Sequence, residues 1–83
     1  MDPELKQRWV EALRSGKYQQ IRNDYHNEAG YCAIGLLQVV MGGTEWQAEQ
    51  ALNCAADVDS LIDLNDNQRF SFQTIADFVE QNL

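Results

Sequence analysis

The sequence predicts an all-α protein, a small single-domain bundle of about four helices packed around a buried central helix. Three observations lead to this prediction. From Cys32 to Met41 there is one polar side chain, Gln38, and no charge, as expected of a helix that other helices cover on several sides. Capping residues mark helix starts near both ends of the chain, at Asp2 and Ser71. A chain of 83 residues holds one hydrophobic core, so residues 1–83 are expected to form one domain.

The first helix is predicted to begin at Asp2-Pro3-Glu4, where Asp caps, Pro takes the first helical position and Glu suits the N-terminal dipole. Gly16 ends it. Trp9 lies on its apolar stripe and is interpreted as a core anchor rather than a ligand platform. Residues 17–29 lose the helical pattern and are predicted to be a connector. The sequence also allows a minimal two-stranded pairing between residues 19–22 of this connector and Phe70.

The central segment could be a buried helix or a buried strand, because a short apolar run fits both. Val39 and Val40 are β-branched and favour the strand. The length of the segment and Gly42, placed where a left-handed C-terminal cap belongs, favour the helix.

Thr44 and Gln47 form a capping box that opens a third helix, predicted to run to about Ala56. Its apolar face is expected to contain Trp46, Ala48, Leu52 and Ala55. Residues 57–60 interrupt the apolar pattern, and residues 61–64 resume it as a short turn or helix. A cluster of turn-forming residues follows at 65–67. The last helix is capped by Ser71, with Phe70 and Ile75 as a hydrophobic staple, and its Asp77 and Glu80 are expected to face outward.

The charge is concentrated in the second half of the chain. Thirteen acidic residues against six Lys and Arg give a net charge of −7. Residues 1–43 are balanced, with five of each, whereas residues 44–83 hold eight acids and only Arg69. Nucleic-acid binding needs clustered cations, so it is disfavoured, and a protein partner with a basic surface is expected instead. The candidate partner-binding residues are four aspartates: Asp57, Asp59, Asp63 and Asp66.

No metal or other cofactor is expected. An EF-hand loop counted from Asp57 would need Gly at its sixth position and Glu at its twelfth, where Ile62 and Gln68 stand. Cys32 and Cys54 have no metal-ligand spacing and are interpreted as small buried apolar residues with reduced thiols, in a cytoplasmic protein. No secretory segment precedes them, and the apolar segment is too short to cross a bilayer.

Two further patterns in the sequence are compatible with other functions. His26 precedes Cys32 by six residues, and Cys32 opens the central helix, which is compatible with a cysteine nucleophile and a base. The sequence pattern Ser71-Phe-x-x-Ile-Ala-Asp77 is typical of the first helix of a helix-turn-helix motif. A recognition helix should follow it, but the chain ends at Leu83. The segment that begins at Ser71 is therefore expected to be a capped amphipathic helix and no more.

Several stretches together resemble a family of small uncharacterised proteins from bacteriophages and bacterial genomes. They are Trp9-Val-Glu-Ala-Leu-Arg-Ser-Gly-Lys-Tyr18, Gly30-Tyr-Cys-Ala-Ile-Gly-Leu-Leu37, Leu64-Asn-Asp66 and Ser71-Phe-Gln-Thr-Ile-Ala-Asp-Phe-Val-Glu80. Members often carry a longer insertion than residues 44–60 of this chain. The resemblance brings no activity; it implies a phage or mobile-element setting, in which small acidic proteins often bind host factors.

The favoured hypothesis is a non-catalytic, acidic accessory protein of phage or mobile-element type that binds, and inhibits, a host nucleic-acid-binding or defence protein. The alternative is a small transcriptional or nucleic-acid-associated factor, and a cysteine-dependent enzyme comes third. A basic face made by Lys6, Arg14, Lys17 and Arg22 would favour the alternative. An accessible Cys32 beside His26 would favour the third.

Overall fold

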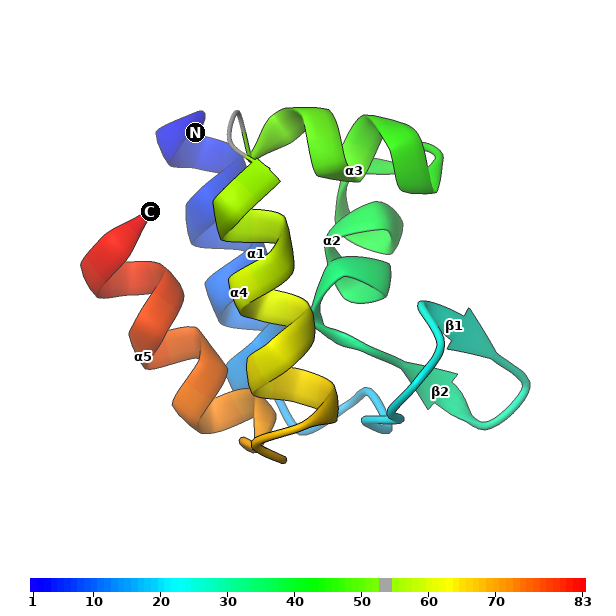
Figure 1. Cartoon of the computed structure of the whole chain (residues 1–83). Helices are drawn as coiled ribbons and strands as arrows, with labels where there is room; N and C mark the ends of the chain where they lie inside the picture. Colours follow the sequence, from blue (N-terminus) through cyan, green and yellow to red (C-terminus); the bar gives the residue numbers. More distant parts are fainter. Residues whose placement is uncertain (53–54) are drawn as a thin grey trace.

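The computed structural model describes residues 1–52 and 55–83. These residues form five helices: α1 (Pro3–Arg14), α2 (Ala33–Met41), α3 (Glu45–Ala51), α4 (Ala55–Asp66) and α5 (Phe72–Asn82). Two short strands, β1 (His26–Asn27) and β2 (Gly30–Tyr31), pair as an antiparallel hairpin. Figure 1 shows the hairpin at one side of the helices, with both chain termini on the opposite side. The all-α prediction with a minimal two-stranded pairing is confirmed.

Helix α2 is the centre of the bundle, as predicted. Its residues 33–37 are all buried, and it packs against α1, α3 and α4, while α5 packs against α1 and α4. Gly42 ends the helix with φ +70°, and its N–H donates to the carbonyl of Gln38. A left-handed cap of this kind favours glycine, because other side chains rarely adopt that conformation.

The predicted helix starts are confirmed by their capping hydrogen bonds. Asp2 accepts from the N–H of Leu5 at 3.2 Å, and Ser71 accepts from the N–H of Thr74 at 3.3 Å. Thr44 and Gln47 form both bonds of the capping box. These side chains satisfy backbone donors that have no partner inside the helix, and each fixes the direction in which the chain enters it.

Trp9 is a core anchor, as predicted. Its side chain is 0% exposed, and its indole N–H donates to the carbonyl of Ala33 at 3.0 Å. This bond satisfies the one polar group of a buried tryptophan and ties α1 to the first residue of α2.

Residues 19–22 do not pair with Phe70 as a strand, so the predicted partner of this segment was wrong. The backbone of this segment pairs with Tyr31 of the hairpin, through Ile21 N–H to the Tyr31 carbonyl and Tyr31 N–H to the Gln19 carbonyl, each 2.9 Å. The segment still meets the start of α5, but through a side chain. The Gln20 amide donates to the Phe70 carbonyl at 2.7 Å and accepts from the Phe72 N–H at 3.1 Å, replacing the backbone contacts of a strand.

The predicted bounds after α2 also need correction. Helix α3 ends at Ala51 rather than near Ala56, and residues 57–60 belong to α4 instead of interrupting the pattern. Helix α4 continues to Asp66, two residues into the predicted turn. Ala48 and Leu52 are buried as expected, but Trp46 is 67% exposed. Cys54 and the side chain of Ala55 lie outside what the structure describes.

Candidate functional site

The four candidate aspartates all lie on α4, but they do not form one row. At about 100° per residue, Asp59, Asp63 and Asp66 follow an i, i+4, i+7 spacing and share one side of the helix. Asp57 lies roughly opposite to them by the same geometry. Asp59 is exposed, whereas the other three are half-buried. The face that the aspartates form is therefore narrower than the sequence suggested.

Asp63 is held at the C-terminal end of α4 by two amide side chains. Asn67 donates to one carboxylate oxygen at 2.9 Å and Gln68 to the other at 2.7 Å. These hydrogen bonds, that of Asn67 first, lower the pKa of the Asp63 carboxyl below its usual range. The backbone carbonyl of Asp63 also accepts from the N–H groups of Asn67 and Gln68. Asp63 therefore has a structural function: it closes the end of the helix.

Asp66 and its neighbour Asn65 hold the 20–23 segment against α4. The Asp66 oxygen Oδ1 accepts from the Asn23 N–H at 3.0 Å and from the Asn65 amide at 2.8 Å. Asn65 is 1% exposed; it also donates to the Ile21 carbonyl at 2.8 Å and accepts from Gln20 at 2.9 Å. This network explains the Leu-Asn-Asp motif as a junction between two segments that lie more than 40 residues apart.

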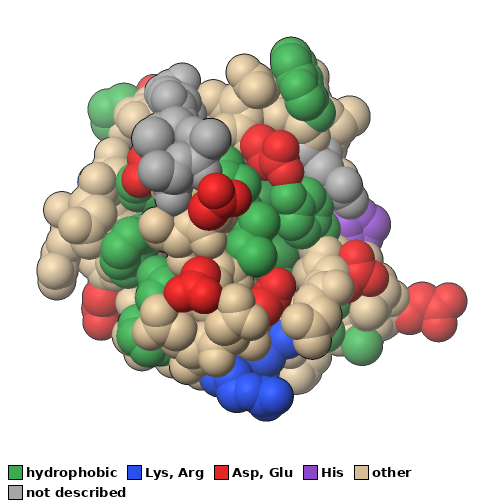
Figure 2. All heavy atoms as spheres, in the orientation of Figure 1, with side chains coloured by type: hydrophobic (Ala, Val, Ile, Leu, Met, Phe, Trp, Pro, Cys, Tyr) green, Lys and Arg blue, Asp and Glu red, His purple; other side chains and the backbone are tan. Residues whose placement is uncertain are grey.

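A hollow of about 310 Å³ opens between α4 and the loop that leads into β1. Its lining residues are Asn23, Asp24, Tyr25, Cys32, Ile62 and Asp66. Figure 2 shows an apolar area on this face of the molecule with acidic side chains around it and Lys or Arg side chains at its lower edge. On α3, Glu49 accepts a hydrogen bond from the Tyr25 hydroxyl, which connects the loop to that helix. Sequence reasoning missed this hollow, because no local pattern places the loop against α4.

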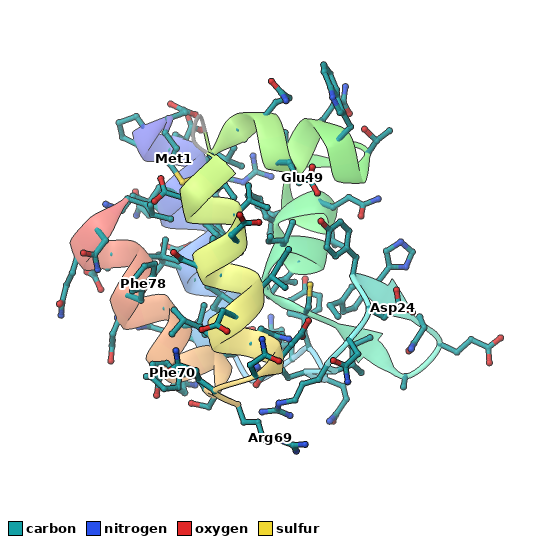
Figure 3. All side chains as sticks on the ribbon, in the orientation of Figure 1. Met1, Asp24, Glu49, Arg69, Phe70 and Phe78 are labelled. Atoms are coloured by element: carbon teal, nitrogen blue, oxygen red, sulfur yellow. The ribbon has the colours of Figure 1, made fainter. Side chains whose placement is uncertain are left out.

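The basic face that would favour the alternative function is not formed by Lys6, Arg14 and Arg22. Arg14 forms ion pairs with Asp77 and Glu80 of α5, each at 2.6 Å. Lys6 donates to the Glu80 carbonyl at 3.1 Å. Arg22 donates to the Arg69 carbonyl at the other end of α5, and Figure 3 shows Arg69 extending from the lower end of the molecule. These cations are thus divided between two places, and Arg14 among them is neutralised by acids of α5.

Cys32 is the N-cap residue of α2, and its sulfur accepts from the N–H of Gly35 at 3.4 Å. The residue is only 4% exposed. Burial, with a further contribution from the charge of Asp66, raises the pKa of the thiol, so the thiol is kept protonated at neutral pH. His26 is exposed on the hairpin, where its ring contacts that of Tyr31. Within residues 1–52 and 55–83, no hydrogen bond joins His26 to Cys32.

The central Gly-Tyr-Cys-x-x-Gly motif has a packing function in this structure. A Cβ atom on Gly35 would overlap the backbone carbonyl of Tyr25, and one on Gly30 would overlap the carbonyl of Gln19. The two glycines therefore let the connector lie directly on α2 and β2, while the small Cys32 caps the helix between them.

The described residues contain neither a candidate metal site nor a membrane-spanning helix. Among residues 1–52 and 55–83, no three His, Cys, Asp or Glu side chains are grouped so that they could hold a metal ion. In the same residues, no helix is long and apolar enough to cross a membrane.

Comparison with known proteins identifies a family for the chain. Residues 1–56 match a family model described as "Domain of unknown function (DUF8296)". Comparisons with curated proteins and with solved structures found no significant match. The match contains the Trp9–Tyr18 and Gly30–Leu37 stretches and covers more than half of the chain. The chain therefore belongs to the DUF8296 family.

Proposed function

We propose that this protein is a non-catalytic accessory protein, of phage or mobile-element type, that binds the basic surface of a host protein in the cytoplasm. The binding surface is the N-terminal half of α4, which carries Asp57 and Asp59, and binding inhibits the host protein. The observation that most strongly supports this proposal concerns Asp57 and Asp59. Unlike Asp63 and Asp66, they receive no hydrogen bond or ion pair from any described residue. Their charges are free to attract a cationic partner.

The surrounding charge supports this proposal over nucleic-acid binding. Residues 44–83 hold eight acids and one cation, and α5 exposes Asp77 and Glu80, whose two negative charges are only partly neutralised by Arg14. Phosphate groups would meet like charges on both helices. A cysteine enzyme has less support, because a buried, protonated Cys32 is a poor nucleophile.

The test is affinity capture of the tagged protein from bacterial lysate, with and without nuclease, at low and high salt. The expected result is a protein partner that survives nuclease, is lost at high salt and is lost from the D57N/D59N variant. A matched control is E4Q/E28Q, which removes the same charge from two exposed acids of α1 and the hairpin turn. This control should retain the partner.

Three outcomes would overturn the proposal. The first is recovery of nucleic acid alone, and the second is recovery of nothing at either salt concentration. The third is equal loss of the partner from D57N/D59N and from E4Q/E28Q, because it would mean that net charge alone, and not the N-terminal half of α4, determines capture.

A further inference from the structure

We propose that the hollow between α4 and the 23–25 loop receives an arginine side chain of the partner protein. This inference rests on the proposed function, because it names the group by which the partner's basic surface is anchored. The hollow has a half-buried apolar residue of α4, Ile62, and two carboxylates, Asp24 from the loop and Asp66 from the end of α4. It therefore offers apolar contact and negative charge in one place.

In each of these two carboxylates, one oxygen accepts no hydrogen bond from the described residues. Asp24 uses Oδ1 to accept from the N–H of Tyr25 at 2.9 Å. Asp66 uses Oδ1 for both of its donors, Asn23 and Asn65. Within the described residues, nothing donates to Oδ2 of either group. The internal bonds thus fix the two carboxylates in position and leave one acceptor on each for a ligand.

The charge of Asp66 acts inside the hollow and not only at its rim. It contributes to the raised pKa of the Cys32 thiol, a residue that also lines the hollow. Asp66 is itself half-buried, so its attraction for a bound cation is screened less than that of a freely exposed carboxylate.

Arginine fits this combination better than lysine. Its planar guanidinium has five N–H donors in a fixed arrangement and can bond to two carboxylates at once, whereas the lysine ammonium is a compact charge that keeps its water strongly. The guanidinium is also less costly to bury beside apolar and aromatic residues, and its three methylene groups can lie along Ile62. A purely apolar side chain would leave both carboxylates desolvated without a partner.

The test uses a short acetylated and amidated Gly-Arg-Gly peptide, titrated into the full chain and followed by amide NMR shifts. Saturable shifts are expected at Tyr25, Cys32 and Ile62. Citrulline has the shape of arginine without its charge, so the citrulline peptide should produce none of these shifts, and the lysine peptide should bind more weakly. The D24N/D66N variant keeps an acceptor at each site and should bind the arginine peptide at least roughly tenfold more weakly, since charge-assisted bonds are lost.

A second variant keeps the inference testable if D24N/D66N does not fold. I62W keeps both charges but fills the hollow, and it should also lose the peptide, while E4Q/E28Q should bind as the unmodified protein does. Equal shifts with citrulline or lysine, or unchanged affinity in both hollow variants, would overturn the inference.

The two proposals can fail separately. If lysate capture depends on Asp57 and Asp59 but the arginine peptide leaves the hollow signals unmoved, the hollow is not the anchor and the proposed function stands. If the peptide binds the hollow but no protein is captured, the proposed function fails and the arginine site remains.

Discussion

The two halves of α4 carry the same acidic residue type but use it differently. In the C-terminal half, Asp63 and Asp66 receive hydrogen bonds from residues of the turn and of the connector. In the N-terminal half, Asp57 and Asp59 receive none from the described residues. The C-terminal half contributes to the fold through these bonds, whereas the N-terminal half makes none with the described residues. The difference shows that a count of acids in a sequence does not tell which of them have a structural function.

Asn65→Ala should have the largest effect, because it removes the residue around which the structural half of α4 is organised. Asn65 is buried and makes three hydrogen bonds, to Gln20, Ile21 and Asp66. The substitution leaves the Ile21 carbonyl and one Gln20 donor without this partner, and we expect a loss of about 2 to 4 kcal/mol in unfolding free energy. Urea denaturation followed by circular dichroism measures it.

Ser60→Ala is the control for this substitution, because Ser60 is exposed on the same helix. Its stability should stay within about 0.5 kcal/mol of the unmodified protein. Should Asn65→Ala be equally mild, the junction between the connector and α4 would not depend on Asn65, and the two halves of the helix would not differ as described.

The same junction marks the limit of what the sequence could predict. Local signals were reliable: the caps at Asp2, Thr44 and Ser71 and the stop at Gly42 depend on neighbouring residues, and each lies where its pattern placed it. At Asn65, by contrast, the local sequence pattern was misleading. Asparagine beside Asp66 and Asn67 is typical of a turn, yet here it is buried in a helix, since its partners come from a segment some 45 residues earlier.

The candidate site was predicted only in part for the same reason. The negative charge of the second half was evident from composition. The four aspartates of α4 were chosen as candidate partner-binding residues on that basis. Their division into bonded and unbonded pairs depends on the connector, on Asn67 and on Gln68. The hollow depends on Asp24 and Ile62, which only the tertiary structure brings together. Trp46 was placed on the apolar face of the third helix, but it is 67% exposed.

Asp63→Asn should have a smaller effect, and one that depends on pH. The pKa of Asp63 is lowered in the folded protein by hydrogen bonds from Asn67 and Gln68. Its stabilising contribution is therefore fully present above the unfolded pKa, near 4, and is lost as the pH falls through the lower folded pKa. The variant should be less stable than the unmodified protein at pH 7, and the difference should shrink toward pH 3.

Urea denaturation at several pH values measures this difference. N67A/Q68A removes the two donors instead of the acceptor and should lose stability with the same pH dependence. A stability difference for Asp63→Asn that is constant from pH 7 to pH 3 would mean that the charged form of Asp63 is not favoured by the fold, and Asp63 would then belong with the free acids.

Asp57→Asn with Asp59→Asn should have the smallest effect on stability, and that is what makes the pair informative. No described residue bonds to either carboxylate, so each substitution should change the unfolding free energy by no more than about 0.5 kcal/mol. Asp57, in the first turn of α4, should account for most of any loss, because a negative charge is favourable near a helix N-terminus. The measurement is urea denaturation beside the capture experiment. A stable double variant that no longer captures its partner would separate binding from folding along one helix, whereas a clearly destabilised one would place all four aspartates in the structural group.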